Sequence, residues 1–330
     1  MNKKVILTII IVVAVIVVGT GIFFFKSSSL DDLIQEASEC QSYQLIGNME
    51  MLENDELKSY QVTSTYAHID EKHYYKVELY DKSLNQSQVI VRNDEGVFVL
   101  TPSLNQAFQF QSEWPDNSPK PYIYQSLITF LKDNSSEKVK DGYLVQGAMT
   151  YENDGRVKSQ EVKFDKDLKP VYISVFDQDG VEVIKVEVTS FEMNQEMKKD
   201  DFLQQNIMKT AKTQYPDSVA ASLPLYPVSL MGSTLENEKV STIDDEINHI
   251  LKFTGDKSFT IIEKTSKDND DFQTETIDGH MIDMIDGVAF ENDQQMTYIS
   301  SGVVCSLYSN DLTTQEKLAV LSSMQSSQVK

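Results

Sequence analysis

The chain has 330 residues, of which 40% are hydrophobic, and carries a formal net charge of -22 at pH 7. This acidic balance argues against nucleic acid as a partner, because proteins that bind it present a basic face to the phosphates. It also argues against adhesion to anionic lipid head groups, which attract lysine and arginine.

An uncharged apolar run over residues 5–25 is the one passage that places the chain in the cell. As a helix it would span roughly 32 Å, enough to cross a hydrocarbon core of about 30 Å. Lys3 and Lys4 precede the run. Lys26 follows it, but the next charges are Asp31 and Asp32. This bias predicts a cytoplasmic N-terminus and an exported remainder. The run is longer than a signal-peptide core and lacks a small-x-small cleavage site, so it favours an uncleaved anchor.

The residues after the run predict one helix and then a long β-meander. Ser29 and Asp32 have the spacing of a capping box, which predicts a helix over 30–40. From 43 to 191, apolar and polar residues alternate between acidic-glycine turns, as in an antiparallel sheet. The apolar phase slips after Val183, which predicts a β-bulge in the last strand.

Two helical segments interrupt or follow this meander. Apolar residues at helical spacing predict a helix over 122–131, after Pro119 and Pro121. A second helical stretch begins near Asp200. We therefore expect a curved sheet with a few helices packed against it.

The remainder of the chain predicts a smaller α+β domain. Thr242 and Asp245 have capping-box spacing and predict a helix over the apolar residues that follow them. Short strands are expected after this helix, and Thr313 begins a final helix. The short strands are predicted around 259–262, 272–277, 281–285, 296–299 and 303–308.

We expect the fold class to be α+β, with four parts along the chain. Three prolines mark the third part as a linker. The parts are a cytoplasmic stub and transmembrane anchor over 1–26, a β-rich domain over 27–213, a linker over 214–227 and the small α+β domain over 228–330.

A search for catalytic chemistry in the sequence is mostly negative. No two of the four histidines have a metal-ligand spacing, and neither a Gly-x-Ser-x-Gly elbow nor a phosphate-binding glycine loop is present. We therefore predict no catalytic residues, no metal and no cofactor. The sequence leaves open whether the two cysteines, Cys40 and Cys305, form a disulfide.

The apolar faces of the predicted strands have two interpretations. Apolar alternation usually makes a packed core. A curved sheet can also leave a concavity open for an apolar ligand. In the second case the residues expected to line the concavity are Val62, Tyr66, Val77, Leu79, Val145, Met149, Ile173 and Val175.

The stretch from Gln88 to Phe110 resembles a segment of the lipoprotein carrier LolA and its relatives. A strand, a turn with glycine, a second strand and a Pro-x-Leu-x-Gln turn follow one another there, and the resemblance extends over roughly 30–202. The residues that carry it are Gly96, Val97, Val99, Pro102, Leu104 and Gln106. The layout is most similar to sporulation and germination proteins of the GerS type from Gram-positive spore formers. Unlike the lipoprotein members, this chain has no cysteine directly after its apolar run.

The resemblance implies a half-open antiparallel β-barrel closed by helices, with an apolar interior, and a role without catalysis. Three hypotheses follow. The first is a single-pass membrane protein that binds an acyl chain, a lipoprotein or an exported protein partner outside the cytoplasm, in sporulation or germination. The second is an envelope-stress sensor or regulator that binds lipoprotein. The third is an enzyme acting on envelope polymers, which the missing catalytic constellation disfavours.

Overall fold

The computed structural model describes residues 29–53, 56–115, 120–151, 153–214, 221–243, 246–265, 273–277, 279–292, 295–300 and 302–326. The predicted membrane span over 5–25 lies outside these residues. Within them, no helix combines the length and the apolar character needed to cross a bilayer. The chain forms two compact units, 1–39 and 40–330, which are described separately.

The described part of the first unit is helix α2 (Leu30–Ser38). Its N-terminus has the predicted capping box. The Ser29 hydroxyl accepts a hydrogen bond from the Asp32 main-chain N–H at 3.2 Å, and the Asp32 carboxylate accepts one from the Ser29 N–H at 3.0 Å. The pair satisfies two of the main-chain donors that a helix start leaves open, so the predicted helix is confirmed.

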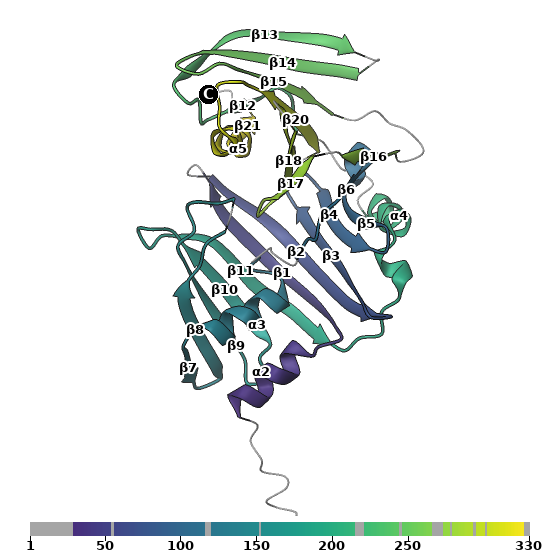
Figure 1. The fold of residues 1–330 in the computed structure, drawn as a ribbon, viewed down its shortest axis with the longest axis vertical. Helices are drawn as coiled ribbons and strands as arrows, with labels where there is room; N and C mark the ends of the chain where they lie inside the picture. The colour runs from purple at the N-terminus through teal and green to yellow at the C-terminus, as the bar shows by residue number, and fades with distance from the viewer. Residues whose placement is uncertain are drawn as a thin grey trace, which may run out of the picture. The chain divides into compact units, whose positions relative to one another are not determined.

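The second unit begins with a twelve-stranded sheet, which we call the first sheet (Figure 1). Its order is β16-β6-β5-β4-β3-β2-β1-β11-β10-β9-β8-β7, so the described strands form an open sheet rather than a closed barrel. Eleven of its strands follow the predicted meander and pair antiparallel. They are β1 (Ser42–Glu53), β2 (Glu56–Ile69), β3 (Lys72–Asp81), β4 (Gln86–Asn93), β5 (Gly96–Thr101), β6 (Gln106–Phe110), β7 (Ser136–Val139), β8 (Gly142–Ala148), β9 (Ser159–Phe164), β10 (Pro170–Phe176) and β11 (Glu182–Met193).

Strand β11 contains the predicted bulge. Val175 lies opposite Ile184, but the next residue, Phe176, lies opposite Glu182, so Val183 is the extra residue. A second register shift occurs where β11 meets β1 at Gly47. A Cβ on Gly47 would come within 2.9 Å of the Glu187 carbonyl oxygen, which explains the glycine there.

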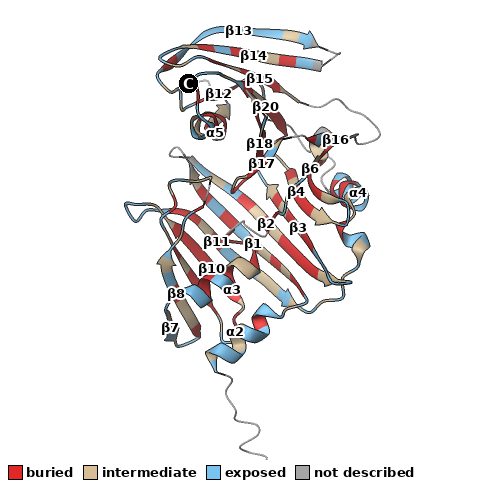
Figure 2. Cartoon of the chain, viewed as in Figure 1, coloured by how far each residue is buried: buried red, intermediate tan, exposed pale blue. Residues whose placement is uncertain are grey.

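Helices cover parts of both faces of the first sheet. Helix α3 (Tyr124–Asp133) is the predicted second helix, and its Tyr124 N–H donates to the Tyr43 hydroxyl at 3.2 Å. The 3-10 turn η2 (Lys199–Phe202) and helix α4 (Gln204–Gln214) lie on the opposite face, where Phe202 packs on Tyr74. Figure 2 shows how the strands between these helices carry buried residues along most of their length.

A second, seven-stranded sheet follows, with the order β13-β14-β15-β20-β19-β18-β17. Its strands are β13 (Ser233–Ile243), β14 (Glu246–Gly255), β15 (Phe259–Lys264), β17 (His280–Asp283), β18 (Val288–Asn292), β19 (Gln295–Ser300) and β20 (Val303–Tyr308). Helix α5 (Thr314–Ser322) begins with the predicted capping box at Thr313 and packs on this sheet. A short pair, β12 (Leu225–Pro227) and β21 (Met324–Ser326), lies beside it.

One expectation for this region is wrong, and one predicted strand joins a different sheet from the one expected. The residues that follow Thr242 form strand β14, not a helix, because Leu251 and Phe253 face the core at the two-residue spacing of a strand. The predicted strand at 272–277 does form, as β16 (Gln273–Ile277), but it pairs parallel with β6 and so extends the first sheet. A contact between segments so far apart in sequence leaves no local pattern.

Candidate functional site

The residues predicted to line an apolar concavity lie in the interior of the first sheet. Seven of the eight are buried, and Met149 is half-buried just after β8. Val62 and Leu79 face each other across β2 and β3, and Val145 and Ile173 lie on either side of Val162. The structure therefore brings them together as packed side chains.

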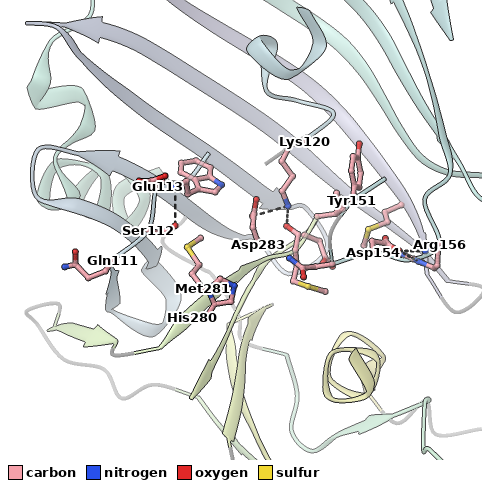
Figure 3. A pocket seen from close by; sticks show the side chains of 16 residues that line it. Gln111, Ser112, Glu113, Lys120, Tyr151, Asp154, Arg156, His280, Met281 and Asp283 are labelled. Atoms are coloured by element: carbon pink, nitrogen blue, oxygen red, sulfur yellow. Dashed lines mark hydrogen bonds and ion pairs between the residues drawn. The ribbon is translucent and has the colours of Figure 1, made fainter. Parts of the chain in front are cut away.

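An open cleft of about 360 Å3 lies where the first and second sheets meet (Figure 3). This volume is at the lower end of the range for small-ligand sites. Its lining mixes sulfur and aromatic groups with charged ones. The lining residues are Met51, Gln111, Ser112, Glu113, Trp114, Lys120, Tyr151, Asn153, Asp154, Arg156, His280, Met281, Asp283, Met284, Ile285 and Asp286.

One wall of the cleft is the turn between β17 and β18. We call residues 283–286 of this turn the plug. The Met284 N–H donates to the Gly287 carbonyl at 3.1 Å, which closes the turn. Its residues reach the first sheet, and Ile285 is buried there. The plug is one of the links between the two sheets.

Lys120 holds the first half of the plug. Its side chain is 5% exposed, and its Nζ lies 3.1 Å from Asp283 Oδ1, as Figure 3 shows. The same ammonium donates to the Met284 carbonyl, and the Tyr122 hydroxyl donates to the Ile285 carbonyl at 3.0 Å. Burial lowers the pKa of Lys120, although the Asp283 carboxylate acts against this shift.

Asp286 holds the second half of the plug. Its carboxylate accepts hydrogen bonds from Lys58 Nζ and the Tyr60 hydroxyl, both at 3.2 Å, and from the Tyr298 hydroxyl at 3.1 Å. Burial alone would raise the pKa of this carboxyl. The Lys58 ammonium and the donated hydrogen bonds outweigh burial and hold the pKa of Asp286 below its ordinary value. Asp286 is therefore a charged group.

The opposite wall of the cleft has its own ion pair. Arg156 donates to both carboxylate oxygens of Asp154, at 2.9 and 2.7 Å, and also to the Leu52 carbonyl at 3.0 Å. This bidentate geometry fixes the guanidinium in place. The lysine and the arginine that line the cleft, Lys120 and Arg156, are thus each paired with a carboxylate of this chain.

The described residues contain no group of three or more histidine, cysteine and acidic side chains that could hold a metal ion. Cys40 and Cys305 are both free. Burial raises the pKa of the Cys305 thiol well above its ordinary value, so this thiol is a weak nucleophile.

Sequence reasoning missed the cleft and its principal residues. Lys120 stands between two prolines, and Asp283 and Asp286 stand in a run read only as a strand end. A signal did exist, because two acids flank Met284 and Ile285 in a segment that is otherwise apolar. Charged residues within an apolar run are costly to bury unless they find partners.

The chain is similar to a sporulation protein. It is 31% identical over 306 residues to "Sporulation protein YdcC" of Bacillus subtilis (strain 168), and the match covers 89% of this chain and 88% of that protein. The chain belongs to the YdcC family. No family model matches it.

The chain is also similar to solved structures at low identity. One is the MucA/MucB complex of Pseudomonas aeruginosa, at 13% identity, with 89% of this chain and 96% of that chain covered and a TM-score of 0.32. Another is the LolA superfamily protein NE2245 from Nitrosomonas europaea, at 12% identity, with 54% and 99% covered and a TM-score of 0.27. Scores this low support no argument about function, so the GerS-type resemblance stays a prediction.

Proposed function

We propose that this chain is a binding protein of sporulation that works outside the cytoplasm, held to the membrane by residues 5–25. Its binding site is the cleft, and its ligand is a segment of an exported protein. Membership of the YdcC family supports the role in sporulation. The apolar run and its flanking charges support the location.

The observation that carries this proposal is the composition of the cleft. A site for a bare acyl chain would be lined almost wholly by apolar groups, whereas this one places Met51, Trp114 and Met281 beside two ion pairs. Methionine side chains adapt their shape to apolar side chains, tryptophan offers a large apolar surface, and the polar rim can bind peptide groups. A mixed lining of this kind fits a protein segment better than a lipid tail.

The role is binding, not catalysis. Lys120 pairs with Asp283, Arg156 with Asp154 and Asp286 with Lys58, and no nucleophile with an adjacent base lies among the described lining residues. A catalytic group needs such an activating neighbour.

Site-specific cross-linking in sporulating cells tests the proposal. A photoreactive amino acid replaces His280, which is exposed at the cleft. The matched control carries it at Glu187, an exposed position on β11 away from the cleft lining. We expect a discrete protein adduct from position 280 and none from 187. Equal labelling at both positions would refute the assignment of the cleft, and a lipid adduct from position 280 would favour an acyl ligand.

A further inference from the structure

We propose that the plug, which forms one wall of the cleft, covers part of the surface on which the ligand docks, and that the ligand is an acidic turn of an exported protein partner which displaces the plug. The turn would carry two carboxylates three residues apart with apolar residues between them. This inference rests on the proposed function, since it names the chemistry that the same cleft recognises.

The plug itself is the first argument. Its sequence is Asp-Met-Ile-Asp, and each end is held by a lysine of the first sheet or of the segment before α3: Asp283 by Lys120 at 3.1 Å and Asp286 by Lys58 at 3.2 Å. Strand β2 and the segment before α3 thus present two ammonium groups at the spacing of these two acids. This surface is complementary to a turn of that pattern, whether the turn belongs to this chain or to another.

The main-chain contacts point to a protein ligand. The Lys120 ammonium donates to the Met284 carbonyl, and the Tyr122 hydroxyl donates to the Ile285 carbonyl at 3.0 Å. The surface thus holds two carboxylates and two consecutive main-chain carbonyls that all come from one short turn. Two carboxylates and two peptide carbonyls are therefore the features that the surface recognises.

The charge of Lys120 excludes an uncharged ligand in place of the plug. Lys120 is almost fully buried, so removal of Asp283 without substitution would leave a desolvated ammonium without its counter-charge. Breaking such a pair is strongly unfavourable, whereas exchanging one carboxylate for another keeps the charge balance. A ligand that displaces the plug has to bring its own negative charge.

The plug also sits at the end of the apolar face predicted from the sequence. Tyr60, whose hydroxyl donates to Asp286, lies two residues before Val62 on β2 and therefore on the same face of the sheet. Leu79 on β3 lies opposite Val62. Leu79 and Asp286 border the same small cavity. The apolar residues between the two acids of a ligand would therefore approach an existing apolar surface.

The test uses the full chain in lipid nanodiscs and a fluorescent hairpin peptide with the sequence of residues 280–291, closed by a terminal disulfide. Its matched control has Asn in place of both plug acids. The proteins are the unchanged chain and the double variant Asp283→Asn, Asp286→Asn, whose own plug is weakened. Fluorescence anisotropy measures binding.

We expect the acidic peptide to bind the double variant at least tenfold more tightly than the Asn peptide does. The unchanged chain should bind it at least tenfold more weakly, because a tethered plug competes at a high effective concentration. Adding Lys120→Met to the double variant should abolish the preference, whereas Lys185→Met, at an exposed pair on β11, should not.

Equal binding of the acidic and Asn peptides would overturn the inference. If laurate displaces the bound peptide at a lower concentration than unlabelled peptide does, the site belongs to an anionic lipid and the inference fails. If the unchanged chain forms a dimer in ultracentrifugation, the site belongs to a second copy of the chain and the inference also fails. If the double variant does not fold, hydrogen exchange on the unchanged chain tests the inference instead. Excess acidic peptide should then speed the exchange of the amides of residues 283–286, and an unaltered exchange rate would contradict the inference.

The two proposals fail separately. A protein adduct at position 280 without a preference for the acidic peptide would leave the cleft as the binding site and remove only the acidic turn. Absence of any adduct would remove the proposed function, whatever the peptide does.

Discussion

The carboxylate of Glu263 accepts a hydrogen bond from the Leu225 main-chain N–H at 3.1 Å inside the core of the second sheet. Glu263 is fully buried on β15, in register with Cys305 on β20, and its second oxygen has no hydrogen-bond partner among the described residues. Burial raises the pKa of Glu263 to about 8. The side chain is thus mostly a neutral acid at pH 7, and it ties β12 to the sheet.

The first prediction follows from that raised pKa. The folded chain holds the Glu263 proton more tightly than the unfolded chain does. The free energy of unfolding therefore falls as the pH rises from the ordinary glutamate pKa of 4.5 toward the folded pKa of about 8. The full loss is on the order of 5 kcal/mol, at about 1.36 kcal/mol per pKa unit. Glu263→Gln keeps the acceptor and should remove this loss. Urea unfolding at pH 5 and pH 9 measures it, and an equal pH response in parent and variant would contradict it.

The second prediction concerns the interior of the first sheet. Ile173 is fully buried on β10, so Ile173→Ala should cost about 2–5 kcal/mol of unfolding free energy. Val171 lies on the same strand but is 42% exposed, and Val171→Ala should cost less than about 0.5 kcal/mol. Denaturant unfolding compares the two. A small loss at Ile173 would instead indicate an open apolar cavity, as the alternative interpretation of the sequence requires.

The third prediction concerns the ion pair that holds the plug. Lys120→Met leaves the Asp283 carboxylate without its buried partner and should cost about 3–5 kcal/mol. The double variant Lys120→Met, Asp283→Asn removes both charges and should recover much of that loss. A double-mutant cycle from thermal or urea unfolding gives the coupling energy. Simple additivity of the two single variants would show that the pair is not coupled.

The fourth prediction concerns topology. The apolar run over 5–25 and the lysines before it predict a cytoplasmic N-terminus and an exported C-terminus. A reporter active only outside the cytoplasm, fused after Lys330, should be active, and the same reporter fused before Met1 should not. A stable but inactive C-terminal fusion would reverse the predicted orientation. A mature chain that begins after Phe25 would show cleavage.

Local patterns predicted local structure well. The capping boxes at Ser29 and Thr313 and the phase slip at Val183 each act within a few residues, and each is found. The helix predicted after Thr242 is wrong because capping-box spacing also occurs by chance in strands. There the alternation of buried and exposed side chains is the better guide to the structure. The parallel pairing of β16 with β6 and the burial of Lys120 against Asp283 depend on distant segments. No periodicity encodes such contacts, so the sequence shows two acids in an apolar run but not the distant partners that bring them into a cleft.

Trp114 is the single tryptophan of the chain, and it lines the cleft. It is 5% exposed and makes an edge contact with Tyr75, with ring centroids 6.2 Å apart. Indole emission depends on polarity and on nearby quenchers, so all tryptophan fluorescence of the native chain comes from one wall of this site. Selective excitation of that ring makes the unmodified protein its own optical reporter of cleft occupancy, without any attached dye.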